Sequence, residues 1–173
     1  MKLYHVSESP NINCFVPRAA PERSARAGEH LVWAIGEKLL HNYLLPRDCP
    51  RVCFYPVPSS TPEDIAKLML NSLAEHVVAI ESNWFKKAHT TPVYLYELPP
   101  ETFTLEDEGA AYYVSQDKVK PLSTQEIPIP IENLIERKVE LRILPNLWPL
   151  RDAVVRSSLQ YSCIRMRNAQ NRP

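Results

Sequence analysis

Short apolar runs bounded by prolines and polar turns recur along the whole chain. Residues 2–6, 31–35, 51–57, 93–98 and 111–115 are such runs, and each contains valine or another aliphatic residue together with at least one aromatic residue. β-Branched and aromatic side chains favour strands, and the turn residues beside each run mark its ends. The pattern therefore predicts a strand over each of these five ranges.

Weaker patterns predict further strands. Residues 76–80 hold three β-branched side chains, and residues 139–144 alternate apolar with charged positions, as a strand with one solvated face does. Residues 161–166 are expected to form the last strand. Residues 103–105 are expected to prolong the strand at 93–98 beyond the Pro99-Pro100 interruption, since proline is tolerated at sheet edges and bulges.

One helix has a well-marked start near residue 60. Ser60 or Thr61 is suited to cap it, Pro62 suits the first turn, and the acidic pair Glu63 and Asp64 complements the helix dipole. Apolar positions at helical spacing predict another helix over residues 37–45, which Pro46 ends. Shorter helices are expected at 82–87, 131–137 and 150–159.

The order of these elements indicates the fold class. Short strands and short helices follow one another without strict alternation, which is typical of an α+β protein. Residues 18–29 are small, charged and without periodicity, and they are expected to form a surface loop. No internal repeat is apparent, and the length fits a single domain over residues 1–173.

Composition excludes two classes of nucleotide-binding protein. The chain has 17 prolines and only 3 glycines, and no two glycines are closely spaced. Neither the Walker pattern nor the dinucleotide-binding glycine pattern can be written anywhere in the sequence. A P-loop or a classical Rossmann site is therefore excluded.

Charge and cysteine content bear on compartment and partners. Lysine and arginine together number 20, as do aspartate and glutamate, so the overall balance disfavours nucleic acid and membrane surfaces as partners. No apolar run is long enough to span a membrane, and the first residues lack a secretory signal, so a cytoplasmic protein is expected. The four cysteines are expected to be reduced. No second Cys or His pair follows Cys49 and Cys53 at zinc-site spacing, and no metal site is predicted.

Basic residues are concentrated in the last part of the chain. Residues 137–173 hold eight basic and two acidic residues, a net charge of about +6. A stripe of this kind is one footprint of nucleic-acid binding, but the aromatic and helix-turn-helix signals that accompany it are absent. The favoured interpretation is a solvated face that pairs with the acidic positions between Glu97 and Glu108.

Three segments in order resemble a known superfamily. The first is KLYHVSESP, the second is LVWAIGEKLLHNYLL, and the third is AAYYVSQDKVKPL. Together they are similar to the ADP-ribosyltransferases of the diphtheria-toxin and poly(ADP-ribose) polymerase type. The resemblance implies a split β-sheet and a site for NAD or a related nucleotide.

The resemblance also implies roles for particular residues. His5 matches the histidine that binds the NAD ribose, Trp33 stands where the family has its first tyrosine, and Tyr43 matches the aromatic residue that stacks on nicotinamide. The catalytic glutamate of the family would fall at Ala111 or Tyr112, and neither can replace a carboxylate. Glu108 is the nearest candidate. From the residues alone, His5 and Trp33 are also expected in a purely structural role.

A phosphate-binding role is the second possibility. RNA 2'-phosphotransferases of the same superfamily pair a strand histidine with arginines, which implies phosphate binding by Arg18, Arg47 and Arg51. Guanidinium groups suit bidentate binding of phosphate or carboxylate. The alternative for Arg47 and Arg51 is an internal ion pair with Asp48 or another acid.

The strings YHVSE, VWAI, NYLLPRDCPR and NLWPLRDAV also resemble an uncharacterised family of small bacterial proteins, over most of the chain. Three functional hypotheses follow. The first is a cleft for a nucleotide or NAD-like ligand in a protein that lacks the catalytic glutamate. The second is a phosphate-handling enzyme that uses histidine and arginine. The third is a binding or interaction module without catalysis.

Overall fold

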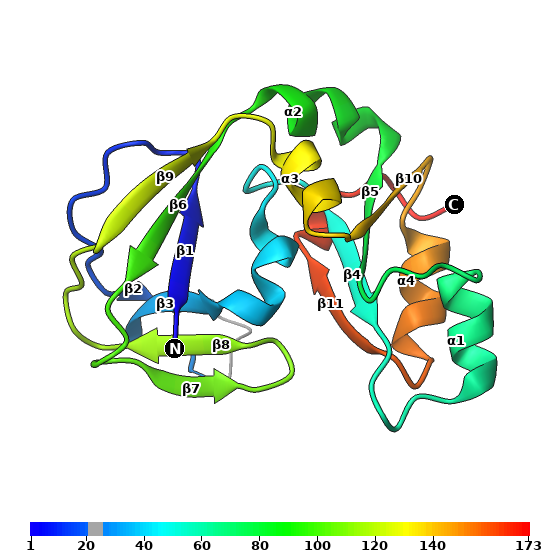
Figure 1. Ribbon diagram of the computed structural model, residues 1–173, viewed down its shortest axis with the longest axis horizontal. Helices are drawn as coiled ribbons and strands as arrows, with labels where there is room; N and C mark the ends of the chain where they lie inside the picture. The colour runs from blue at the N-terminus through cyan, green and yellow to red at the C-terminus, as the bar shows by residue number, and fades with distance from the viewer. Residues whose placement is uncertain (21–25) are drawn as a thin grey trace. The chain divides into compact units, whose positions relative to one another are not determined.

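The computed structural model spans residues 1–173 and describes residues 1–20 and 26–173. The chain divides into two compact units, each built from two separate segments. The first unit takes residues 1–40 and 93–127, and the second takes residues 41–92 and 128–173. Each unit contains its own β-sheet (Figure 1). The α+β class is confirmed.

The first unit is an antiparallel sheet. Its strands run in the order β7-β8-β3-β1-β6-β9, and β2 pairs with the start of β3. The bounds are β1 (Leu3–Ser7), β2 (Arg18–Ala19), β3 (His30–Gly36), β6 (Val93–Leu98), β7 (Thr104–Asp107), β8 (Tyr112–Ser115) and β9 (Ser123–Ile127).

One face of this sheet is covered by the chain that follows β1. Phe15 pairs with Val119 through two backbone hydrogen bonds, and both side chains pack on Leu3 and Tyr96 in one buried cluster. The Tyr96 hydroxyl donates to the carbonyl of Ser9 at 2.5 Å. A buried tyrosine needs such a partner, and here the bond holds the covering segment on the sheet.

The second unit has a mixed sheet in the order β10-β5-β4-β11. Only the β10 and β5 pair is parallel; β5 with β4 and β4 with β11 are antiparallel. The strands are β4 (Arg51–Tyr55), β5 (Val77–Glu81), β10 (Glu140–Leu144) and β11 (Gln160–Ile164). The α-helices are α1 (Pro62–Met69), α2 (Phe85–Thr90), α3 (Pro130–Glu136) and α4 (Trp148–Val155), and the 3-10 helices are η1 (Glu37–Tyr43), η2 (Ser82–Trp84) and η3 (Met166–Asn168).

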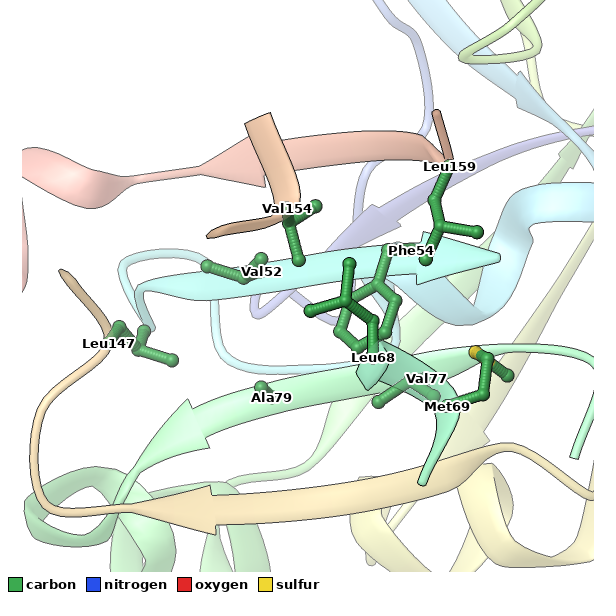
Figure 2. Packing of buried hydrophobic residues seen from close by; sticks show 9 residues of the cluster. All are labelled: Val52, Phe54, Leu68, Met69, Val77, Ala79, Leu147, Val154 and Leu159. Atoms are coloured by element: carbon green, nitrogen blue, oxygen red, sulfur yellow. The ribbon is translucent and has the colours of Figure 1, made fainter. Parts of the chain in front are cut away.

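Side chains from two strands and two helices form the core of the second unit. Val52 and Phe54 on β4 lie opposite Ala79 and Val77 on β5, so all four extend from one face of the sheet. Figure 2 shows that Leu68 of α1 and Val154 of α4 pack on this face. The apolar stripes of both helices are thereby buried.

The start of α1 confirms the capping prediction at Thr61. Its hydroxyl accepts a hydrogen bond from the backbone N–H of Asp64 at 3.3 Å, and Pro62 occupies the first turn. Ser60 has another role, because its hydroxyl donates to the carbonyl of Ser158. The hydroxyl and backbone N–H of Ser158 both donate to the carboxylate of Asp64, which joins the helix start to the turn before β11.

Several predicted elements differ in the structure. Residues 37–43 form a 3-10 helix with a kink at Leu39, not an α-helix through residue 45. Residues 104–107 do not prolong β6; they form β7, which pairs with β8, because the prolines at 99 and 100 turn the chain back. Strand β9 was missed because four of its five residues are exposed. In the predicted loop 18–29, residues 18–19 form β2, and residues 21–25 lie outside the described residues.

Several arginines in the last part of the chain form ion pairs inside the second unit, and their pairing with the acidic positions between Glu97 and Glu108 of the first unit stays a prediction. Arg142 pairs with Glu140 at 2.6 Å, and Arg151 and Arg172 both pair with Asp152. Glu106, from the acidic stretch, instead pairs with Arg26 at 3.2 Å. The short sequence separation of Arg142 from Glu140 makes such a local pair easy to form.

Candidate functional site

His5 lies on β1, a central strand of the first sheet, and is half-buried. Its Nδ1 lies 2.9 Å from the backbone carbonyl oxygen of Trp33. Since a carbonyl can only accept, Nδ1 is the donor, and in the neutral ring Nε2 is then an acceptor. The ring also packs beside Phe15, with centroids 4.7 Å apart. This hydrogen bond and the ring contact fix both the tautomer and the orientation of the imidazole.

The side chain of Trp33 extends from the opposite face of the same sheet. Tyr4 pairs with Ile35 across β1 and β3, so these two side chains share a face. Trp33 is two residues from Ile35 and shares that face, whereas His5 is one residue from Tyr4 and lies on the other. The expectation that the His5 and Trp33 side chains face one ligand is therefore corrected.

Trp33 is half-buried among apolar neighbours. Its ring meets Tyr112 edge-on at 5.9 Å and packs on the cluster of Leu31, Val114 and Ala20. On the His5 face, the neighbouring β3 positions are Val32 and Ala34. The structural interpretation of Trp33 is the one that these contacts favour.

Tyr43 ends η1 and belongs to the second unit. The guanidinium carbon of Arg51 lies 5.6 Å from the centroid of its ring, a cation–π contact. The tyrosine ring is thus already in contact with a cation of its own chain. Its participation in a ligand site with His5 stays a prediction.

Neither β8 nor the residue before it places a carboxylate at the predicted catalytic position, Ala111 or Tyr112. Ala111 has a positive φ of 51°, and its carbonyl accepts a hydrogen bond from the N–H of Gly36 at 2.9 Å. Tyr112 then starts β8. Glu108 is exposed in the turn between β7 and β8, and the irregular register of this hairpin falls earlier, between Leu105 and Asp107.

Arg51 is buried, with 2% of its surface exposed, at the start of β4. Its Nε donates to the carbonyl of Asn42 at 2.8 Å, and its Nη1 donates to the carbonyls of Pro46 and Cys49 at 3.1 and 2.9 Å. Burial lowers the pKa of Arg51. These bonds hold the loop after η1, and they leave Arg51 a structural role in place of the predicted phosphate contact.

The other two arginines of that prediction lie in different units. Arg18 is exposed on β2 of the first unit, and Arg47 is exposed in the loop of the second.

Burial raises the pKa of the thiol of Cys49 to about 11 and that of Cys53 to about 12. Both thiols are therefore protonated at neutral pH and are weak ligands and nucleophiles.

A histidine pair in the second unit was missed by the sequence analysis. The rings of His41 and His76 lie 4.4 Å apart, and the ring of Tyr55 lies 4.7 Å from His76. Burial, helped by the charges of His76 and Arg137, lowers the pKa of His41 to about 3. No sequence signal joins these residues, because His76 comes from the segment before β5, far along the chain from η1.

Two structural findings apply to residues 1–20 and 26–173. Within these ranges, no group of three or more His, Cys, Asp or Glu side chains is arranged to hold a metal ion. Within the same ranges, none of the helices combines the length and apolar character that crossing a membrane requires.

The fold and these side chains define an α+β protein with two sheets and a half-buried, anchored histidine on the first. The chain belongs to DUF6886, a family of unknown function, whose family model matches residues 4–169. The match confirms the prediction that the chain belongs to an uncharacterised family. No curated protein and no solved structure matches the chain. Nothing in these comparisons links it to the ADP-ribosyltransferases.

Proposed function

We propose that the first unit binds a nucleotide-like small molecule through His5 and catalyses no transfer of it. The observation that carries this proposal is the strand order. The three segments that resemble the ADP-ribosyltransferases form β1, β3 and β8, and these strands are neighbours in the order β8-β3-β1. Segments far apart in the sequence are thus brought together, which supports a common origin for the resemblance.

The chemistry of His5 suits a sugar hydroxyl. With Nδ1 donating to the carbonyl of Trp33, Nε2 of the neutral ring accepts hydrogen bonds. A ribose hydroxyl is a donor of the matching kind. Because the ring is already oriented, little side-chain entropy is lost when a ligand binds.

Group transfer from NAD passes through an oxocarbenium-like state, which a carboxylate must help to align. Ala111, Tyr112 and Tyr113 occupy the stretch where the superfamily has its glutamate, and Glu108 is exposed in the adjacent turn. Binding without this group lowers no barrier. The missing carboxylate favours a binding protein over a transferase. The third hypothesis, an interaction module, also lacks catalysis and differs from this proposal in that it needs no small-molecule ligand.

Replacing His5 with alanine is expected to weaken binding of NAD, ADP-ribose or AMP about tenfold, as loss of one polar contact does. Isothermal titration calorimetry measures the affinity. His30→Ala, an exposed histidine on the same sheet, is the matched control and is expected to bind as the wild type does. Equal affinities in wild type and His5→Ala, with both variants folded, would remove His5 from the site.

Purified protein is expected to release no nicotinamide from NAD above the buffer background. The assay compares wild type with Glu108→Gln, each with and without protein and nucleic-acid acceptors. Both proteins are expected to match the background, because Ala111, Tyr112 and Tyr113 supply no carboxylate where the superfamily has its catalytic glutamate. Turnover by the wild type that Glu108→Gln abolishes would refute this prediction and restore the transferase interpretation.

A further inference from the structure

A buried carboxylate in the second unit holds a surface segment of the same unit. Residues 170–172 are exposed and belong to no helix or strand. Glu81, the last residue of β5, is fully buried. The backbone N–H of Gln170 donates to both oxygens of its carboxylate, at 3.2 Å to Oε1 and 3.0 Å to Oε2. The backbone of an exposed segment is thereby bound to a charged group in the interior of the unit.

The carboxylate of Glu81 is oriented independently of this segment. The backbone N–H of Leu147, at the start of α4, donates to Oε1 at 3.2 Å. The positive end of a helix dipole at this place favours a carboxylate. Within residues 1–20 and 26–173, Gln170 is the only residue that donates to Oε2. Because a buried charged oxygen without a donor is costly, the site favours a backbone N–H at this position.

Two side chains of the second unit bind backbone carbonyls of the same segment. The indole N–H of Trp148 donates to the carbonyl of Gln170 at 2.7 Å, and the side-chain amide of Asn146 donates to the carbonyl of Asn171 at 3.0 Å. The amide oxygen of Asn146 accepts from the backbone N–H of Trp148 at 2.9 Å, which fixes the direction of that amide. One contact uses the side chain at 170, whose amide donates to the carbonyl of Pro145 at 3.0 Å. The other contacts involve backbone groups that any peptide carries.

Arg172 supplies the contact that selects a side chain. Its Nη1 and Nη2 donate to Oδ2 and Oδ1 of Asp152 at 2.9 and 3.2 Å, a bidentate pair. Its guanidinium carbon lies 4.3 Å from the centroid of the Trp148 ring. Asp152 is held in turn by Arg151, whose Nη1 donates to Oδ1 at 3.0 Å. A carboxylate beside an aromatic face is selective for a planar guanidinium group. With the Arg172 side chain 54% exposed, the pair adds little stability, so its geometry favours recognition.

We propose that Glu81, Asn146, Trp148 and Asp152 form a binding site for a short arginine-containing segment of a partner protein, which residues 170–172 occupy within the chain. Fixed groups bind the N–H and carbonyls of a peptide backbone, and one position selects a side chain, as in other peptide-binding sites. The partner's arginine is expected two residues after the residue whose backbone meets Glu81 and Trp148. This site is independent of the function proposed for the first unit.

The tethered segment acts as a competitor of the partner. Its effective concentration at the site is on the order of millimolar, as for short flexible connections. A second copy of the chain would bring the identical residues at a far lower concentration and would gain no contact by exchange. A partner protein that carries a better-fitting segment gains contacts, and the arginine-containing segment of such a protein is therefore the occupant that the site favours.

The test opens the site in the full chain and adds a peptide. Gln170→Pro together with Arg172→Ala removes the N–H donor to Glu81 and the guanidinium group of the chain's own segment. The probe is the acetylated hexapeptide of residues 168–173, titrated by isothermal calorimetry. The double variant is expected to bind this probe about tenfold more tightly than the wild type, because the tethered competitor is weakened. Arg172→Ala alone leaves the backbone unchanged and is expected to bind about threefold more tightly, which keeps the test valid if circular dichroism shows the double variant to be unfolded.

Matched controls separate guanidinium recognition from net charge. A probe with lysine in place of the arginine keeps the charge but loses the planar fork, and it is expected to bind the double variant about fivefold more weakly. Asp152→Asn, added to the double variant, is expected to weaken binding of the arginine probe about tenfold. Glu132→Gln removes an exposed carboxylate on α3 of the same unit and is expected to change the affinity by less than about twofold.

Three results would overturn the proposal. Equal affinities for the arginine and lysine probes would show that charge alone explains binding. Equal affinities of the wild type and of folded Arg172→Ala would show that residues 170–172 do not cover the site. Concentration-dependent dimers of the wild type that Arg172→Ala abolishes, measured by light scattering, would assign the site to a second copy. His5→Ala is expected to bind the probe as the wild type does, so failure of the function proposed for the first unit leaves this site standing.

Discussion

Arg51→Ala is expected to lower the free energy of unfolding by about 3 kcal/mol, as measured by urea denaturation at neutral pH. The substitution removes the donor to the carbonyls of Asn42, Pro46 and Cys49. Hydrogen bonds from a charged donor contribute more than neutral ones, and buried carbonyls left without a partner add a desolvation cost. Relief of the buried positive charge offsets part of this loss.

Two further variants separate the hydrogen bonds from the charge. Arg51→Lys keeps the charge but replaces the planar fork with a point donor, and it is expected to lose most of the same stability. Arg156→Ala, at an exposed position of the same unit, is expected to change stability by less than about 0.5 kcal/mol. A fully stable Arg51→Lys would show that charge, and not the arrangement of donors, holds the loop.

Acid is expected to destabilise the fold through His41. Burial lowers the pKa of this imidazole to about 3, from an ordinary value of 6.5. Above pH 6.5 the imidazole is neutral in both the folded and the unfolded state, so it does not affect stability; as the pH falls from 6.5 toward 3, the unfolded state binds a proton that the folded state does not, and the folded state is progressively destabilised. Each pKa unit corresponds to about 1.4 kcal/mol, so the total approaches about 5 kcal/mol, a large part of the stability of a typical domain.

Urea denaturation of wild type and His41→Gln between pH 7 and pH 3 measures this loss. Because other groups titrate in both proteins, the informative quantity is the difference between the two curves. The wild type is expected to lose stability more steeply below pH 6.5. His89→Gln, at an exposed position on α2, is the matched control and is expected to follow the wild-type curve. Parallel curves for wild type and His41→Gln would exclude His41 as the acid-sensitive group.

The sequence predicted correctly those strands and helices that have strong local signals, such as an apolar run or a capping residue. Each of the valine and aromatic runs at 31–35, 51–57 and 93–98 overlaps a strand of the structure, and Thr61 caps its helix as the sequence indicated. The failures have physical causes. The apolar spacing of residues 37–45 carries no signal for the kink at Leu39 that interrupts η1, and β9 has too little apolar surface to give a periodic signal.

At the candidate site, the sequence places residues on strands but does not show which face of the sheet their side chains occupy. Both His5 and Trp33 were correctly placed on strands, yet a shift of one residue in register exchanges the two faces of a strand, and only the pairing of Tyr4 with Ile35 shows which face each occupies. Arg47 and Arg51 look alike in the sequence. The structure separates them into an exposed residue on the loop and a buried donor beneath it.

The sequence by itself determined the α+β class, most strands, the cap of α1 and the exclusion of glycine-rich nucleotide loops, because these depend on neighbouring residues. Tertiary structure alone decided which segments meet: His41 with His76, and the loop at 46–49 with Arg165 and Asn168. Contacts between distant segments depend on sheet order and register, and these follow from the packing of the whole chain and not from local propensity.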